Sequence, residues 1–277
     1  MEEFLKNIIM GIVQGIAEFL PISSSGHLVI FSEFLNLENL EETGMLLNVI
    51  VHLGTLISVF IFFRKDIQLM INQIPAIPAF VKRGFKVKDE SDENTMLLWY
   101  IFLGTLPAAI LGLTFKENLE SLFTNKFVVL VALLVNALVL WSSKFTIDKQ
   151  VKINAYFAIL IGAGQALAIV PGISRSGTTI VLALWLGVTR SKCASFSFLL
   201  SIPVILGASL LEMKSIGNYG LELNQLINMF GAFLAAAISG YLAIRFLTYI
   251  LHKQKFEYFA YYCIFISICS LIFSFLI

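Results

Sequence analysis

Long apolar stretches with almost no charged residues constrain the fold of this chain more than any other feature. Crossing a hydrocarbon core of about 30 Å takes roughly 20 apolar residues in a helix, because lipid offers no hydrogen-bond partner to an open backbone. Six stretches meet this requirement: residues 45–63, 96–115, 127–141 with their flanks, 195–211, 226–249 and 256–277. Since 58% of all residues are hydrophobic and only 13% are charged, the composition excludes an ordinary soluble domain. We therefore predict an all-α integral membrane protein with six transmembrane helices.

Two further apolar stretches, residues 8–22 and 153–173, are interrupted by a proline that is followed by serines and glycines. Irregular backbone at membrane depth is tolerated only where protein or a water-filled cavity covers it. We therefore predict two re-entrant helical hairpins, over residues 8–37 and 153–188. A proline-kinked spanning helix is the alternative. The polar cluster at the first interruption, which contains Glu18 and His27, argues against a plain kink.

The two interrupted stretches are related as an internal repeat. A shift of 151 residues aligns residues 11–27 with residues 162–178 without a gap, and seven of the seventeen positions are identical. Each copy has one hairpin followed by three spans, and an odd number of crossings inverts the second copy in the membrane. We predict a single membrane domain over residues 1–277, with a first inverted repeat over 1–142 and a second over 153–277.

The cations predict the orientation. Thirteen of the 19 lysines and arginines lie in segments that this topology places on one side, including the loop 64–95, against four on the other side. Because cytoplasmic loops carry an excess of Lys and Arg, the loop 64–95 is expected in the cytoplasm and both termini outside. The first hairpin then enters from the outer face and the second from the cytoplasm. We expect the site between them to open to the outer face.

The two copies of the repeat differ at the positions of polar and ionisable side chains that could take part in a reaction. Ser24 is paired with Arg175, His27 with Thr178, and Glu18 with Ile169. One hairpin thus supplies a carboxylate, hydroxyls and an imidazole, and the other supplies a guanidinium among hydroxyls and glycines. Since broken helices of inverted repeats meet near the bilayer midplane, the pattern predicts one composite site for an anion.

Gln14 and Glu18 are four residues apart, so they share one face of a helix. An acid within the membrane is a functional candidate by default. Glu18 could hold a divalent cation, with Gln14 as a neutral oxygen ligand, or it could act as a general base. The alternative is that Glu18 pairs with Arg175 and only holds the two hairpins together.

Ser24 and His27 belong to the Ser-Ser-Ser-Gly-His run that follows Pro21. A serine activated by a neighbouring base is a candidate nucleophile, although serine is also a favoured N-cap for the helix that starts near His27. An imidazole can carry a proton near neutral pH. His27 is therefore the candidate proton carrier, whereas His52 lies in a predicted span and could serve only as a secondary candidate.

The second interruption, residues 171–179, combines glycines, hydroxyls and Arg175 directly before a helical run. Backbone amides at a helix N-terminus favour anions, and the arginine fork matches phosphate oxygens. The pattern predicts a phosphate-binding segment. A buried ion pair between Arg175 and Glu18 is again the alternative.

With these two segments the chain resembles the undecaprenyl-pyrophosphate phosphatase family, also called bacitracin-resistance proteins. The first signature is present as Gln14-x-x-x-Glu18 with Pro21-Ile22-Ser23-Ser24-Ser25-Gly26-His27, and the second as Pro171-Gly172-Ile173-Ser174-Arg175-Ser176-Gly177-Thr178. Many family members have Glu at the first position of the first signature, and Gln14 stands there in this chain. This departure removes one negative charge, which puts a two-carboxylate metal site in doubt.

The resemblance implies a plasma-membrane enzyme of bacteria that removes the terminal phosphate of C55 prenyl pyrophosphate and so regenerates a carrier lipid for cell-wall synthesis. It implies dependence on Mg²⁺ or Ca²⁺, competition with bacitracin for the substrate, and a homodimer as the candidate assembly. The catalytic residues carried over are Glu18, Ser24, His27 and Arg175. The substrate-binding residues carried over are Gln14, Ser23, Ser25, Gly26, Gly172, Ser174, Ser176, Gly177 and Thr178.

Two other classes compete with this interpretation. A secondary transporter or lipid flippase would also have an inverted repeat with broken helices. The type 2 phosphatidate phosphatases need a downstream histidine followed by an aspartate, but residues 176–277 contain no aspartate. A net charge of +1 gives no reason to expect a nucleic acid partner, and the three cysteines lack the spacing of a zinc site.

Overall fold

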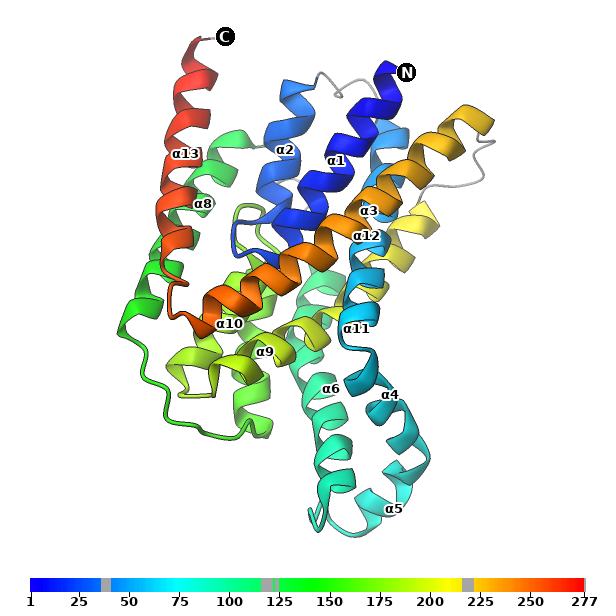
Figure 1. Ribbon diagram of the computed structural model, residues 1–277, viewed down its shortest axis with the longest axis vertical. Helices are drawn as coiled ribbons and strands as arrows, with labels where there is room; N and C mark the ends of the chain where they lie inside the picture. Colours follow the sequence, from blue (N-terminus) through cyan, green and yellow to red (C-terminus); the bar gives the residue numbers. More distant parts are fainter. Residues whose placement is uncertain (36–40, 116–121, 123–124, 216–221, 277) are drawn as a thin grey trace.

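A computed structural model describes residues 1–35, 41–115, 122, 125–215 and 222–276 (Figure 1). Regular secondary structure in these ranges is helical, apart from one parallel bridge between Val151 and Val188. The α-helices are α1 (Glu2–Phe19), α2 (Ser24–Phe34), α3 (Glu41–Phe62), α4 (Arg64–Gln73), α5 (Ile77–Lys82), α6 (Glu90–Thr114), α8 (Lys126–Ser142), α9 (Ala155–Leu167), α10 (Arg175–Trp185), α11 (Arg190–Ser215), α12 (Leu223–His252) and α13 (Tyr258–Leu276). The prediction of an all-α protein is confirmed.

Among the described residues, five helical segments are long and apolar enough to cross a membrane, which supports an integral membrane protein. They are Gly44–Phe62, Glu90–Thr114, Phe127–Phe145, Arg190–Lys214 and Leu223–His252. Each coincides with a span predicted from the sequence. The sixth predicted span, residues 256–277, corresponds to α13, which is a shorter apolar helix over Tyr258–Ile272, and residue 277 lies outside the described ranges.

Both interrupted stretches fold as two helices around a break. In the first, α1 ends at Phe19 and α2 starts at Ser24, and in the second, α9 ends at Leu167 and α10 starts at Arg175. A proline stands in each break, where it removes no helical hydrogen bond. Within each pair the two helices pack against each other. The first pair starts earlier than predicted, because α1 begins at Glu2 rather than near residue 8.

The first helix of each interrupted pair packs on a helix from the other half of the chain. Helix α1 packs on α12, which belongs to the second half, and α9 packs on α6, which belongs to the first half. Helix α8 pairs with α13, and α3 pairs with α11. Two repeat-related glycines allow this close packing. A Cβ atom added to Gly11 would lie 2.3 Å from the Ala232 carbonyl oxygen, and one added to Gly162 would lie 2.2 Å from the Gly104 carbonyl oxygen.

We expect Gly162→Ala to destabilise the protein, because the added Cβ must push α9 away from α6. Overpacking of this kind costs about 1–3 kcal/mol, and the apparent melting temperature of the purified protein should fall by several degrees. Gly207→Ala is the matched control, because Gly207 of α11 has no atom within 4 Å of a new Cβ and alanine is the better helix former. Equal melting of the two variants would contradict this account of the contact between α6 and α9.

Both ends of the described chain lie at one end of the molecule (Figure 1), and the outward orientation of that end stays a prediction. The N-terminal end of α1 and the C-terminal end of α13 lie at the top of Figure 1, whereas α4 and α5 lie at the bottom. The loop predicted over residues 64–95 is partly helical, since it contains α4, α5 and the start of α6. There Arg83 pairs with Asp92 at 2.8 Å and fixes the turn before α6.

Candidate active site

Asn136 of α8 holds the two breaks together. Its amide nitrogen donates to the Pro21 carbonyl oxygen at 3.1 Å, and its amide oxygen accepts from the Ser174 backbone N–H at 3.0 Å. A third bond runs directly between the breaks, from the Gly172 N–H to the Ser25 hydroxyl at 3.4 Å. Asn136 is fully buried, so one amide ties together two segments that are distant in the sequence.

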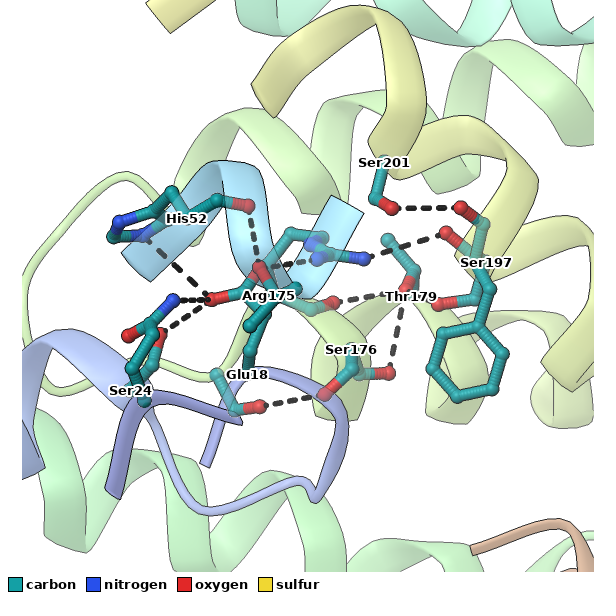
Figure 2. A network of polar contacts seen from close by, with 12 residues as sticks. Glu18, Ser24, His52, Arg175, Ser176, Thr179, Ser197 and Ser201 are labelled. Carbon is teal, nitrogen blue, oxygen red and sulfur yellow. Dashed lines mark hydrogen bonds and ion pairs between the residues drawn. The ribbon is translucent and has the colours of Figure 1, made fainter. Parts of the chain in front are cut away.

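Glu18, at the end of α1, is the centre of the polar network between the breaks (Figure 2). Its Oε1 accepts from Nη2 of Arg175 at 2.5 Å. Its Oε2 accepts from the Ser24 hydroxyl at 2.7 Å and from the Gln14 amide at 3.0 Å. Nε2 of His52 lies 3.8 Å from the same oxygen. The Glu18 carboxylate is therefore in direct contact with the Arg175 guanidinium and with the Ser24 hydroxyl.

Contacts with α11 and within α10 orient Arg175. Nη1 donates to the Ser197 carbonyl oxygen of α11 at 3.4 Å. The hydroxyls of Ser197 and Thr179 lie 2.6 Å apart, and Thr179 also donates to the Arg175 carbonyl oxygen at 2.8 Å (Figure 2). Since Arg175 is the first residue of α10, its side chain lies at a helix N-terminus, where an anion is favoured.

This network lies in the wall of a cavity of about 970 Å³. Five predicted site residues line it, namely Glu18, Ser24, Ser25, Ser174 and Arg175. Its lining extends along α1 from Glu18 to Asn7 and Glu3. It also includes an apolar wall from α6, from the break after α9 and from α11, formed by Ala108, Ala109, Gly112, Ala168, Ile169 and Leu210. The cavity thus has a charged region at Glu18 and Arg175 next to an apolar wall, which fits an amphipathic ligand with an anionic head.

The remaining predicted substrate-binding residues shape the breaks instead of lining the cavity. Ser23 and Ser174 cap the two short helices, since their hydroxyls accept from the backbone N–H of Gly26 at 3.3 Å and of Gly177 at 3.1 Å. The repeat-related pairs Ser23–Ser25 and Ser174–Ser176 each have their hydroxyls 3.2 Å apart. The residues outside the lining are Gln14, Ser23, Gly26, Gly172, Ser176, Gly177 and Thr178.

Gly172 is required by the backbone and by packing. Its φ of +101° is a conformation that favours glycine. A Cβ atom there would also lie 2.4 Å from the Val129 carbonyl oxygen of α8. Glycine at this position therefore allows close contact of this break with α8, and the substrate-binding role of Gly172 stays a prediction.

Comparison with known proteins decides the family. A family model described as "Bacitracin resistance protein BacA" matches residues 7–269. The chain belongs to the BacA family. Its relatives include proteins named undecaprenyl-diphosphatase. The protein from Methanobrevibacter smithii is 41% identical over 94% of each chain. Those from Methanosphaera stadtmanae and Halothermothrix orenii are 38% identical over 99% of each chain and 40% identical over 98% of each chain, respectively. The matched segment contains both breaks and the whole polar network.

In this BacA-family chain the structure does not bring His27 to Glu18. Its Nδ1 lies 2.8 Å from the Ser23 carbonyl oxygen, and its Nε2 lies 2.9 Å from the hydroxyl of Tyr262. The imidazole also stacks on the Tyr262 ring, with centroids 5.6 Å apart. His27 thus connects α2 to α13 and is not among the residues that line the cavity.

The imidazole beside the Glu18 carboxylate belongs to His52 of α3, which was only a secondary candidate from the sequence. Its Nδ1 lies 2.8 Å from the Asn48 carbonyl oxygen. Because a carbonyl only accepts, Nδ1 must carry a proton, and the neutral ring then leaves Nε2 as an acceptor. Asn48 and His52 both line the cavity, and their spacing of four residues on one helix face was the signal available in the sequence.

The side chains around Glu18 do not fit a cation held by Glu18 and Gln14. Because a carboxylate only accepts hydrogen bonds, Gln14 must present its NH₂ group to Glu18 rather than its oxygen. The carboxylate oxygens already receive donors from Arg175 and Ser24. Among the described residues, no group of three or more His, Cys, Asp and Glu side chains could hold a metal. The expected dependence on Mg²⁺ or Ca²⁺ stays a prediction.

Proposed function

We propose that this chain is an undecaprenyl-diphosphatase that hydrolyses the terminal phosphate of C55 prenyl diphosphate and regenerates the monophosphate carrier lipid for cell-wall synthesis. The observation that carries the proposal is the contact of Glu18 with Arg175 and Ser24 at the charged region of an amphipathic cavity. The names of the relatives support it. Bacitracin resistance then follows, because an enzyme that consumes this lipid competes with bacitracin for it.

Arg175 is the residue that binds the diphosphate in this proposal. Its planar fork offers two parallel N–H donors to phosphate oxygens, and the N-terminus of α10 adds a favourable dipole. In the structure these donors point to Glu18 and the Ser197 carbonyl oxygen. The incoming phosphate replaces Glu18 as the partner of Arg175, which frees one carboxylate oxygen for proton transfer.

Glu18 is the general base. The Ser24 hydroxyl already donates to Glu18 at 2.7 Å, which is within the range that proton transfer requires. Two routes are consistent with this contact. In one, Ser24 attacks the terminal phosphorus, its proton passes to Glu18, the bond to the bridging oxygen breaks, and water then hydrolyses the phosphoserine. In the other, Ser24 orients a water molecule that attacks the terminal phosphorus and gives its proton to Glu18, while the bond from that phosphorus to the bridging oxygen breaks and the prenyl monophosphate leaves.

His52 is the imidazole that we assign to proton handling at this site, in place of His27. We expect His52→Gln to lower kcat by about 10²-fold, at the lower end of general acid–base effects, without lowering the melting temperature. His27→Gln is the matched substitution. It loses the stacking on Tyr262 and should lower the melting temperature while kcat per folded molecule stays within a few-fold. The reverse ranking of the two kcat values would restore His27 as the proton carrier.

We also propose that the chain has six spans and two re-entrant hairpins in a 3+3 inverted repeat, in the plasma membrane. The exchange of α1 and α9 between the halves supports this arrangement, because an inverted repeat relates α1 to α9 and α12 to α6. The lining of the cavity extends along α1 to Glu3, at the end of the molecule where both termini lie (Figure 1). This supports a site that opens to the outer face. A homodimer remains the candidate assembly.

Phosphate release in detergent tests the enzyme against the flippase alternative, which the inverted repeat also favours. Purified protein should release phosphate from C55 prenyl diphosphate with multiple turnovers in detergent micelles, where no second membrane side exists. Adding a chelator to the same assay tests the cation, and the family resemblance predicts loss of activity that Mg²⁺ or Ca²⁺ restores. Lipid movement across vesicles without phosphate release in micelles would instead identify a flippase.

A further inference from the structure

Gln165 is a buried side chain with no partner for its amide. It lies in the last turn of α9 and is 1% exposed. Within the described ranges, neither its amide nitrogen nor its amide oxygen has a hydrogen-bond partner. Gln165 lines the same cavity as Ser174 and Arg175. Because an unpaired buried amide costs free energy, a partner from outside the chain would stabilise this position.

The internal repeat shows what the amide lacks. Gln165 is related by the 151-residue shift to Gln14, whose amide nitrogen donates to Glu18 at 3.0 Å, one helical turn further on. In the second copy the residue one turn further on is Ile169, which offers no acceptor. The second hairpin has therefore kept the glutamine and replaced its acceptor with an apolar side chain.

The surroundings of Gln165 select an anionic ligand. Gln165 lines the same cavity as Arg175, and Arg175 and the N-terminus of α10 both favour negative charge there. The carboxylate of the network, Glu18, already accepts from three side chains. A phosphate oxygen is an acceptor that matches the two N–H donors of the amide.

We propose that Gln165 is a substrate-binding residue whose amide donates to a phosphate oxygen of the bound prenyl diphosphate. This inference rests on the proposed function. It gives the two glutamines of the repeat different tasks: Gln14 orients the base, and Gln165 binds the anion. A buried water that satisfies the amide, or a purely structural role, is the competing outcome.

Gln165→Leu separates these outcomes, because binding and stability should change in opposite directions. One hydrogen bond to a charged group corresponds to about a 10- to 100-fold effect, so kcat/KM for C55 prenyl diphosphate should fall by that factor. The melting temperature without substrate should stay constant or rise, since a buried amide without a partner is removed. The rise in melting temperature on adding substrate should shrink. Gln165→Glu, of the same shape, should lose more activity through repulsion of phosphate.

Gln68→Leu is the matched control. Gln68 is exposed on α4 and does not line the cavity. The control should keep kcat/KM within about twofold of the wild-type value, since the same amide is removed outside the substrate cavity.

The inference is overturned if wild-type protein hydrolyses the lipid and Gln165→Leu and Gln165→Glu do so equally well. It is also overturned if Gln165→Leu lowers the melting temperature while the shift induced by substrate is unchanged, because the amide would then be structural or bound to water. In both cases the proposed function stands. Failure of the wild-type protein to release phosphate would instead remove the proposed function itself.

Discussion

Glu18→Gln is expected to lower kcat by about 10²–10⁴-fold, the range for loss of a general base, without raising KM. The substituted amide keeps the size of the side chain but cannot take the proton of Ser24. At the same time Arg175 loses its carboxylate partner and one negative charge leaves the site, so binding of the diphosphate should be as tight as before or tighter. Steady-state phosphate release over a range of lipid concentrations separates the two constants.

Glu3→Gln is the control for the loss of one negative charge. Glu3 lines the same cavity at the other end of α1, and its removal should change kcat by less than about twofold, because exposed charges interact weakly. If Glu18→Gln kept near-wild-type kcat while the melting temperature fell, Glu18 would be only the structural partner of Arg175. That is the alternative that the sequence left open.

Arg175→Lys should lower kcat/KM by about 10²–10³-fold, the range for removing one donor that stabilises developing charge. Lysine keeps the positive charge next to Glu18, so the buried carboxylate is not left unpaired. It lacks the planar fork that can bond two phosphate oxygens and the Ser197 carbonyl oxygen together. Alanine is a poorer choice here, because breaking a buried ion pair costs about 3–5 kcal/mol of stability.

Arg245→Lys provides the matched comparison, since Arg245 is exposed on α12 and does not line the cavity. Kinetics and melting temperature of that variant should match the wild-type values. Substrate affinity can be followed separately through the shift of the melting temperature on adding lipid. An Arg175→Lys variant with unchanged affinity and unchanged turnover would show that Arg175 only joins the two hairpins.

The sequence predicted the elements whose cause is local. A proline that is followed by serines and glycines favours the end of a helix, so the breaks near Pro21 and Pro171 could be placed without a structure. Proline alone is not sufficient, since Pro107 and Pro203 lie inside α6 and α11. Glu18 and Arg175 were recognisable because a charge within an apolar segment needs a partner, and the repeat indicated that the two breaks meet. The serine caps were also foreseeable, since Ser23 and Ser174 precede glycine at the same spacing.

The parts that depend on packing between distant helices could not be predicted. The direction of the His27 side chain depends on Tyr262, 235 residues later in the chain, and no local pattern encodes that contact. Asn136 could equally have lined a cavity or bridged helices, and its two bonds to the breaks require α8 to lie between them. His52 was only a secondary candidate from the sequence, because its position beside Glu18 depends on the packing of α3 against α1.

The most direct test of the account compares phosphate release from C55 prenyl diphosphate by wild-type protein and by the double variant Glu18→Gln/Arg175→Lys. Both proteins are purified identically, so a contaminating phosphatase would act equally in both samples. The account predicts many turnovers for the wild-type protein and none above background for a double variant that is folded, as judged by its melting curve. Equal phosphate release by the two proteins would contradict the claim that the meeting of the two breaks forms the phosphatase site.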